Sequence, residues 1–302
     1  MTLTRLNFAA GAALIACAAL SGVGTVVAAT ASPVMPAITN PATHLSIPGK
    51  FIWFDLASSD TEASQKFYGD VFGWEIQHVR GTPDRYSVIR NEGKPIGGMF
   101  GQKVPEGAAR GARWLSFASV ANMDRAVGMM TAGGGQVLVP ATQVPGRGTH
   151  ALLRDSQGAV IGLLQSSSGD PADVPVATGN FFWVDLYARD PAAAANAYKQ
   201  LGFEVTPDEV SGDSRLLLSA KGYARAGIVK LPPEGREPGW LAYVQVDDVP
   251  ATLSRVRAAG GTVLREPDPA ILGGQIAVFA DSLGGVLGVI HWTPAATAGA
   301  TP

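Results

Sequence analysis

The sequence contains one strand-and-helix pattern twice, in the stretches FIWFDLASSDTEASQKFYGDVFGWEI at residues 51–76 and FFWVDLYARDPAAAANAYKQLGFEV at residues 181–205. In each copy, alternating apolar residues typical of a strand precede an Asp that can cap a helix. Two further matched pairs follow in the same order, 114–127 with 240–253 and 155–164 with 281–290. This nearly constant offset indicates that a whole domain has been duplicated.

The repeat sets the expected domain boundaries. We expect a first domain at residues 49–166, a linker rich in Ser, Asp and Pro at 167–178, and a second domain at 179–293, followed by a disordered tail at 294–302. Within the first domain, the patterns predict the order strand, helix, strand, strand, strand, and then the same order again. The predicted first strand spans 51–57, and the predicted second helix spans 123–132. The fold class is therefore α+β.

These motifs resemble the vicinal-oxygen-chelate superfamily, which includes glyoxalases and bleomycin-resistance proteins. The run from Asp60 to Trp74 is similar to the family's first helix, and the turn at 155–158 is similar to the family's turn before its last strand. The resemblance covers nearly all of residues 49–293. It implies two tandem domains, each a pair of βαβββ modules that form a cupped mixed sheet with helices outside. It does not fix the activity, because many chemistries occur on one scaffold.

The N-terminal region differs from the rest of the chain. Residues 6–31 carry no charge and follow Arg5, so residues 1–31 are predicted to be a signal peptide and the protein to be exported, periplasmic or secreted, beginning near Thr30 or Ser32. An alternative is a lipoprotein, because Leu14 to Cys17 resembles a bacterial lipobox and would place a lipid anchor on Cys17. An uncleaved membrane anchor is a third interpretation. Residues 32–48 contain four prolines and are expected to form an extended tether.

Composition narrows the class of partner. The chain of 302 residues is 46% hydrophobic and 16% charged and has a formal net charge of −2. It therefore lacks the basic excess of a nucleic-acid-binding protein, and we expect no membrane insertion of the mature domains. Its single cysteine, Cys17, excludes an internal disulfide. The expected partner is a small-molecule ligand.

The resemblance also allows a test for a metal site. Metal-dependent relatives carry a His or Gln at the position of Trp53, a ligand on the strand that begins the second module, and a Glu on the last strand. This chain has Trp53, Leu115 and Gly162 at those three positions in the first domain, and Trp183, Leu241 and Gly288 in the second. None of these side chains can coordinate a divalent cation. We therefore expect no metal and no other cofactor.

Strand alternation predicts which residues face the cleft. It places Phe51, Trp53, Asp55 and Ala57 on the cleft face, and Ile52, Phe54 and Leu56 on the face that packs against helices. The candidate ligand-binding residues are aromatic or polar side chains on the cleft face: Trp183, Tyr187, Tyr243 and Gln245 in the second domain, and Trp53 and Phe117 in the first. The second cleft is the more polar and aromatic, so we expect binding there.

Asp185 and Asp55 are the candidate catalytic residues. Each lies two residues after a cleft Trp, and a carboxylate in a partly apolar cleft can act as a base. An equally weighted interpretation pairs each carboxylate with Arg or with backbone donors. Another alternative is that core side chains have filled both clefts.

Three functions remain open from the sequence. The first is a metal-free protein of the bleomycin-resistance type that binds a small apolar or aromatic molecule. The second is a metal-independent lyase or isomerase with an Asp general base. The third is a rigid module for docking a partner.

Overall fold

The computed structural model describes residues 34–82, 86–104, 107, 109–208, 215–233 and 237–293. The predicted signal peptide, Cys17 and the predicted C-terminal tail lie outside the described residues. Within the described ranges, no helix is both long enough and apolar enough to cross a bilayer.

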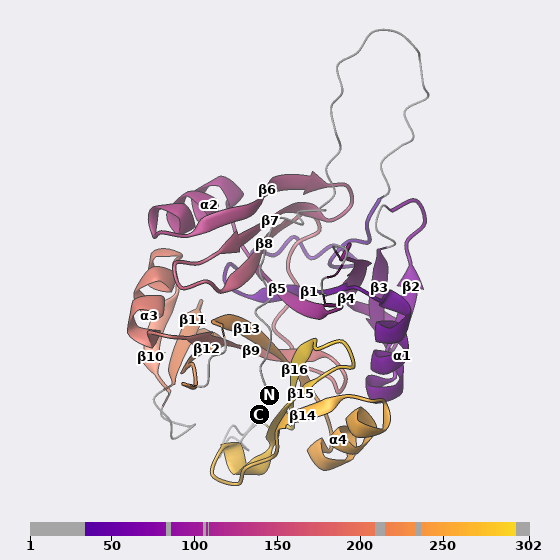
Figure 1. The fold of residues 1–302 in the computed structure, drawn as a ribbon. Coiled ribbons are helices and arrows are strands. Elements are labelled where there is room, and N and C mark those ends of the chain that lie inside the picture. The colour runs from indigo at the N-terminus through magenta and orange to yellow at the C-terminus, as the bar shows by residue number, and fades with distance from the viewer. Residues whose placement is uncertain are drawn as a thin grey trace, which may run out of the picture.

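Each domain consists of two βαβββ modules, as the repeat predicts. The first module contains β1 (Phe51–Ser58), α1 (Thr61–Phe72), β2 (Glu75–His78), β3 (Ser87–Asn91) and β4 (Lys94–Gly101). The second contains β5 (Ala112–Ser119), α2 (Met123–Ala132), β6 (Gln136–Val144), β7 (Gly148–Arg154) and β8 (Val160–Ser166). Together these strands form one mixed sheet in the order β2-β3-β4-β1-β5-β8-β7-β6 (Figure 1).

The second domain repeats this arrangement. Its first module contains β9 (Phe181–Ala188), α3 (Pro191–Gln200), β10 (Glu204–Pro207), β11 (Leu216–Ala220) and β12 (Tyr223–Lys230). Its second contains β13 (Gly239–Gln245), α4 (Val249–Ala258), β14 (Thr262–Arg265), a short 3₁₀ turn η2 (Leu272–Gly274), β15 (Ile276–Ala280) and β16 (Val286–Ile290). The strand order is β10-β11-β12-β9-β13-β16-β15-β14, which is equivalent to that of the first sheet.

Local chemistry explains where the first helix begins and ends. The Asp60 side chain accepts a hydrogen bond from the backbone N–H of Ala63 at 3.0 Å, which satisfies one of the donors left free in the first helical turn. Gly73 ends the helix in a left-handed conformation with φ 73°, which glycine adopts without a side-chain clash. The apolar residues of the helix, including Phe67 and Val71, then face the interior.

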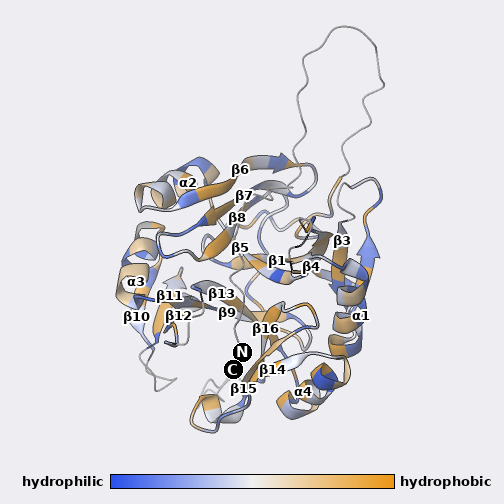
Figure 2. Ribbon diagram, viewed as in Figure 1, coloured by the Kyte–Doolittle hydropathy of each residue, from blue (hydrophilic) through white to orange (hydrophobic). Residues whose placement is uncertain are grey.

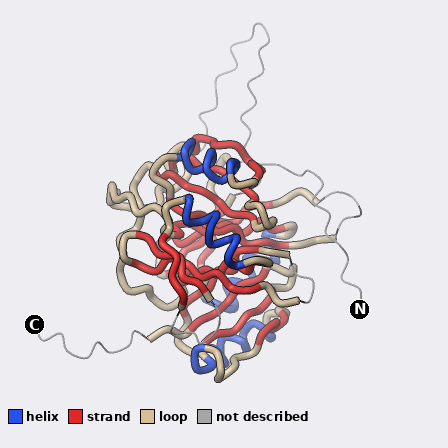
Figure 3. Tube along the Cα trace, turned by 90° about the vertical axis from the view of Figure 1, so that its left-hand side faces the viewer, coloured by secondary structure: helices blue, strands red, loops and turns tan. Residues whose placement is uncertain are grey.

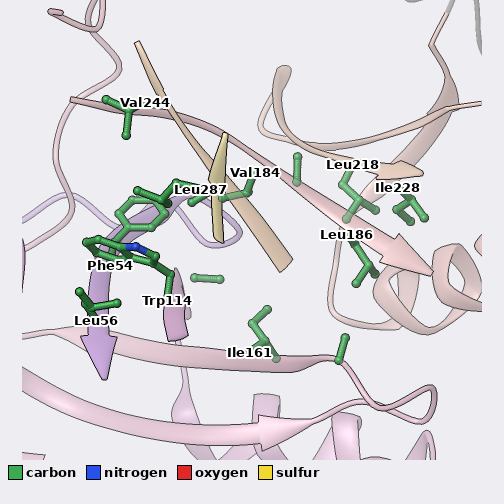
Figure 4. Close-up of a cluster of buried hydrophobic side chains, with 14 of the residues drawn as sticks. Phe54, Leu56, Trp114, Ile161, Val184, Leu186, Leu218, Ile228, Val244 and Leu287 are labelled. Atoms are coloured by element: carbon green, nitrogen blue, oxygen red, sulfur yellow. The ribbon is translucent and has the colours of Figure 1, made fainter. Parts of the chain in front are cut away.

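The two sheets pack back to back around one shared core. Figure 1 shows the sheets one above the other, with α2 and α3 at one side and α1 and α4 at the other, and Figure 3 shows helices lying over strands on one of these sides. The ring of Phe54 stacks on that of Phe181 with 3.9 Å between centroids. Figure 4 shows side chains from both domains in this core: Phe54, Leu56, Trp114 and Ile161 with Val184, Leu186 and Val244.

Two related hydrogen bonds cross between the domains. The Tyr68 hydroxyl donates to Asp281 at 2.8 Å, and the Tyr198 hydroxyl donates to Asp155 at 3.2 Å. Both Asp residues also accept backbone N–H groups of the turn before the last strand of their own domain. The helices, meanwhile, mix hydrophilic and hydrophobic residues (Figure 2), as expected when only one face is buried.

The N-terminal region packs differently from our expectation. Residues 34–48, which we call the N-terminal strap, were expected to form an extended tether, but they lie on the first domain. Their backbone and side chains bond to residues 145–170: Met35 N–H donates to the Pro145 carbonyl at 2.8 Å, and Thr43 Oγ1 donates to the Asp170 carbonyl at 2.7 Å. Prolines prevent regular structure here, but they leave other backbone groups able to bond and apolar side chains able to pack.

Candidate functional site

The face of each sheet that points away from the shared core is its cup. Alternation correctly places Trp53 and Asp55 in the first cup and Phe54 and Leu56 in the core. It is wrong for Phe51 and Ile52, because the pairing of β1 with β5 shifts register between Phe51 and Trp53. Phe51 therefore turns to the core, 5.0 Å from the Trp240 ring, and Ile52 joins the cup.

Asp55 lies in a buried polar network at the bottom of the first cup. Its Oδ1 accepts hydrogen bonds from Trp53 Nε1 at 2.8 Å and from the Tyr86 hydroxyl at 2.7 Å. Arg147 donates to the same Tyr86 hydroxyl at 2.6 Å, and its guanidinium carbon lies 4.1 Å from the centre of the Trp53 ring. The Asp55 carboxylate therefore accepts hydrogen bonds from buried side chains, and the positive charge of Arg147 lies nearby.

Burial favours the neutral forms of Tyr86 and His150 in this network. Desolvation raises the pKa of Tyr86 well above its usual range, and the neighbouring Arg147 opposes this rise. Tyr86 therefore remains a protonated donor to Asp55. Desolvation also lowers the pKa of His150, with Asp55 opposing the shift and Arg147 adding to it. At neutral pH His150 is uncharged, and its ring lies near Phe117 with 6.2 Å between centroids.

The second cup has the same Trp and Asp pair but a different partner. Asp185 Oδ1 accepts from Trp183 Nε1 at 2.9 Å and from Arg215 Nη1 at 3.1 Å. Arg215 occupies the position of Tyr86 in the repeat. Tyr86 directly precedes β3, and Arg215 directly precedes the equivalent strand, β11. The hydroxyls of Tyr187 and Tyr243 lie 3.3 Å apart. Burial raises the pKa of Tyr187, with Asp185 adding to the rise.

Glycines make room for both carboxylates. Gly98 pairs with Asp55 and Gly227 pairs with Asp185 in the neighbouring strands. A Cβ at Gly98 would lie 1.9 Å from the Tyr86 hydroxyl oxygen, and one at Gly227 would lie 2.3 Å from Asp185 Oδ1. The close approach of strand and carboxylate therefore depends on glycine at both positions.

Two aromatic residues and a glycine form the row at which metal-dependent relatives carry their ligands. In the first sheet Trp53 pairs with Phe117, which pairs with Gly162, and in the second sheet Trp183, Tyr243 and Gly288 form the same row. A Cβ on Gly162 would meet the Phe117 ring at 2.2 Å, so no longer side chain fits there. Leu115, which the sequence placed in this row, instead pairs with Asp55, although it lies on the same face.

These donor sets do not fit a divalent cation. Across the described ranges, no three His, Cys, Asp or Glu side chains converge as a metal site would require. Freedom from metal remains a prediction about the protein in solution.

A cavity of about 690 Å³ opens where the second cup meets the first domain. Its apolar wall includes Trp114 and Leu115 from β5, Trp240 and Leu241 from β13, and Val278 from β15. Its polar groups include Tyr187, Arg113, Lys230, Arg265 and Glu237. This volume lies in the range of small-molecule pockets, which are mostly apolar with a few polar groups.

The structure separates the predicted site residues instead of bringing them into one site. Tyr187 lines the interdomain cavity, whereas Trp183, Asp185, Tyr243 and Gln245 are absent from its lining. Asp185 and Tyr243 are buried beneath the cup surface, and Gln245 binds the backbone of Trp292 at the end of the last strand. Trp53, Asp55 and Phe117 are buried in the first cup.

Sequence reasoning missed several residues that matter in the structure. Tyr86 and Arg215 donate hydrogen bonds to the two carboxylates, and Arg147 donates to Tyr86. Trp114 and Trp240 are among the residues that line the cavity. The repeat contained a signal for the last two, since the tryptophans match in the two copies. It contained none for Arg147, because the residue at the corresponding position is Gly273.

The architecture defines the class of protein: two eight-stranded sheets, each built from two βαβββ modules, in tandem domains with outward cups. The family model "Bleomycin resistance protein-like N-terminal" matches residues 50–81, and the model "Glyoxalase/Bleomycin resistance protein/Dioxygenase superfamily" matches residues 180–287. The chain belongs to this glyoxalase and bleomycin-resistance superfamily, which confirms the resemblance seen in the sequence.

Particular relatives extend over most of the chain. A Mycobacterium tuberculosis protein with the provisional name glyoxylase CFP32 is 30% identical over 248 residues, covering 80% of this chain and 94% of that protein. The anthracycline biosynthesis protein DnrV of Streptomyces peucetius is 27% identical over 234 residues, covering 73% of this chain and 85% of that protein.

Solved structures share the fold. The Mn(II)-bound glyoxalase from Novosphingobium aromaticivorans has a TM-score of 0.56 at 16% identity, covering 82% of this chain and 83% of that one. Homoprotocatechuate 2,3-dioxygenase from Brevibacterium fuscum has a TM-score of 0.58 at 14% identity, covering 88% of this chain and 86% of that one. At these identities the likeness concerns the fold alone.

Proposed function

We propose that the protein is an exported, metal-free member of this superfamily that binds a small apolar or aromatic molecule in the interdomain cavity. The observation that carries the proposal is the cavity of about 690 Å³, which both domains line and whose apolar side chains include Leu115, Leu241 and Val278. Together with the ring of Tyr187, these side chains provide an apolar surface for a small ligand. The anthracycline-related name of DnrV is consistent with an aromatic ligand.

The polar groups of the cavity would orient the ligand. The Tyr187 hydroxyl can donate to a ligand oxygen, since burial raises its pKa and keeps it protonated at neutral pH. Arg265 and Lys230 bring positive charge to the same rim, and Glu237 is the acidic side chain in the lining. A few directed contacts against an apolar wall are typical of specific small-molecule binding.

Binding is favoured over proton abstraction by the state of the two carboxylates. Asp55 and Asp185 are 7% and 0% exposed, and each is held by a Trp and by a Tyr or an Arg. Neither carboxylate lines the interdomain cavity. A general base must reach the proton that it removes, so a ligand in this cavity would not meet either Asp.

A thermal-shift screen of aromatic compounds with the mature protein, followed by calorimetry, tests the proposal, because a ligand of the native state raises its stability. Tyr187→Ala should weaken the compound found by about 1–3 kcal/mol through lost aromatic burial and a lost hydrogen bond. Tyr223→Ala is the matched control, since Tyr223 is 56% exposed and lies outside the cavity lining.

Two further measurements complete the test. Binding should survive dialysis against a chelator, and elemental analysis should find no stoichiometric divalent metal. Equal affinity of Tyr187→Ala and Tyr223→Ala would contradict the assignment of the cavity, and loss of binding on chelation would contradict the metal-free proposal.

A further inference from the structure

The N-terminal strap inserts two apolar side chains into the first cup. Met35 and Ile38 are 4% and 6% exposed and belong to one cluster with Trp53, Tyr86 and Phe117. These three aromatic residues belong to the first cup, so a ligand that entered this cup would contact them. The strap thus occupies the volume that a small apolar molecule would fill.

The strap also offers an oxygen to the cation of the cup. The Pro36 carbonyl accepts from Arg147 Nε at 3.4 Å, a long hydrogen bond. Arg147 is 3% exposed, and its Nη2 is buried without a hydrogen-bond partner, as is Nε2 of His150. Buried donors without partners destabilise a protein, so this site can accept a better-placed oxygen than the strap provides.

The strap is an addition to the repeated domain. The segment that precedes the second domain, residues 167–178, does not contribute to the cluster of the second cup. Its Ser168 and Asp170 accept hydrogen bonds from the strap, and Asp170 also accepts one from Ser119 of the first domain at 2.6 Å. The cluster of the second cup is formed by residues from Phe182 to Ile290, which belong to the second domain itself. The second domain therefore forms its cup without a strap, so a strap is not a general requirement of this domain.

We propose that the strap is an exchangeable internal occupant of the first cup, which a ligand displaces. The ligand is an apolar molecule with one neutral carbonyl oxygen. Its apolar part replaces Met35 and Ile38, and its oxygen replaces the Pro36 carbonyl and accepts from Arg147. A neutral oxygen fits better than a carboxylate, because Asp55 already supplies the negative charge through Tyr86.

Exchange predicts that strap and ligand compete. A ligand that binds only the open cup has an apparent affinity reduced by the fraction of molecules with the strap displaced. Displacing the strap by mutation should therefore strengthen ligand binding. This effect is specific to the first cup and does not depend on the interdomain cavity.

The test uses the full mature chain and acetylnaphthalene, a neutral aromatic ketone. Met35→Asp combined with Ile38→Asp places two charges in the apolar cluster and should release the strap, whereas Val34→Asp is the matched control at a strap residue that is 70% exposed. All proteins carry Tyr187→Ala to weaken the interdomain cavity. Equilibrium dialysis should show about tenfold tighter ketone binding to the released variant than to the control.

Two comparisons establish the role of Arg147. Ethylnaphthalene has the same ring but no oxygen, so the released variant should bind it more weakly than the ketone. Arg147→Lys in the released background should remove this difference, because lysine keeps the charge but cannot donate from the same positions. Equal ketone affinity of the released variant and Val34→Asp, with both proteins folded by circular dichroism, overturns the proposal.

Hydrogen exchange on the unmodified chain keeps the proposal testable if the released variant does not fold. The amide of Met35 forms a hydrogen bond with the first domain, and those of Thr43 and Ile47 form hydrogen bonds with the linker. All three should exchange faster than the amides of β1 if the strap opens locally. Saturating ketone should speed their exchange further and leave β1 unchanged. If the strap amides exchange no faster than the β1 amides, both with and without ketone, the proposal is overturned.

Discussion

The two cups start from the same Trp-x-Asp sequence and are built differently. In the first, Asp55 is held by Trp53 and Tyr86, and the cation comes from Arg147 in the turn between β6 and β7. In the second, Arg215 bonds Asp185 directly. Both solutions compensate a buried carboxylate, which would otherwise be costly. Duplication thus preserved the scaffold and the need for a partner, but not the partner itself.

The covering of the cups differs as well. The N-terminal strap closes the first cup, and Trp53 beneath it is 2% exposed. The second cup is covered by its own residues Ile271 and Leu272, and its edge continues into the interdomain cavity through Tyr187 and Leu241. The first cup, which the strap closes, therefore contributes mainly to stability in this state. The edge of the second cup instead lines the open interdomain cavity.

The largest expected difference between the cups concerns their tryptophans. Trp53→Ala should reduce the free energy of unfolding by about 3–5 kcal/mol, since it empties a closed cluster and removes a donor to Asp55. Trp183→Ala should cost only about 1–2 kcal/mol, because Trp183 is partly exposed. Urea denaturation followed by circular dichroism measures both. Equal losses would show that the two cups are equally closed.

Next in size is the effect of filling the space beside the carboxylates. Gly98→Ala should destabilise the protein by about 2–3 kcal/mol, because the new methyl group meets the Tyr86 hydroxyl and Asp55. Gly227→Ala should cost somewhat less, since it meets one Asp185 oxygen and Arg215 at 3.3 Å.

The matched control for these substitutions is Gly128→Ala. Gly128 lies in α2 with nothing within 4 Å of an added Cβ, so alanine should stabilise the helix by about 0.5–1 kcal/mol. Thermal melting of the three variants separates a local clash from a general effect of replacing glycine. A neutral Gly98→Ala would mean that Asp55 and Tyr86 rearrange at little cost.

The smallest expected effect concerns the connection between the halves. Asp173 bonds Lys50 beside the first sheet at 2.9 Å and Arg225 in β12 of the second at 2.6 Å. The hydrogen bonds from Arg225, opposed in part by desolvation, lower its pKa from 3.8 to about 2. Asp173→Asn should cost about 1 kcal/mol at pH 7, a value that allows for solvent screening.

The pH dependence follows from the lowered pKa. The folded state binds the proton of Asp173 more weakly than the unfolded state does, so its contribution is present above about pH 4 and is lost as the pH falls towards 2. The difference in stability between wild type and Asp173→Asn should therefore shrink over that range. Arg225→Gln should have little further effect in the Asp173→Asn background. A difference that is constant with pH would exclude a role for the carboxylate charge.

Local sequence patterns predicted much of the fold. The repeat established two tandem domains, and the predicted second helix, 123–132, is the observed α2. The N-cap at Asp60 and the stop at Gly73 followed from rules that involve only neighbouring residues. The cup positions of Trp53, Asp55, Trp183 and Tyr187 followed from alternation, because side chains in a regular strand change faces at every residue.

The rest depended on contacts between distant residues. The register shift that turns Phe51 into the core arises from pairing with β5, and pairing is not visible in one strand alone. Arg147 reaches Tyr86 and Trp53 only after β7 has joined the sheet. The sequence by itself therefore determined the elements, their order and the faces of regular strands, since these depend on local geometry. The tertiary structure alone decided which side chains hold the two carboxylates, where the strap lies and where the cavity opens, because those depend on free energies of packing between segments far apart in the chain.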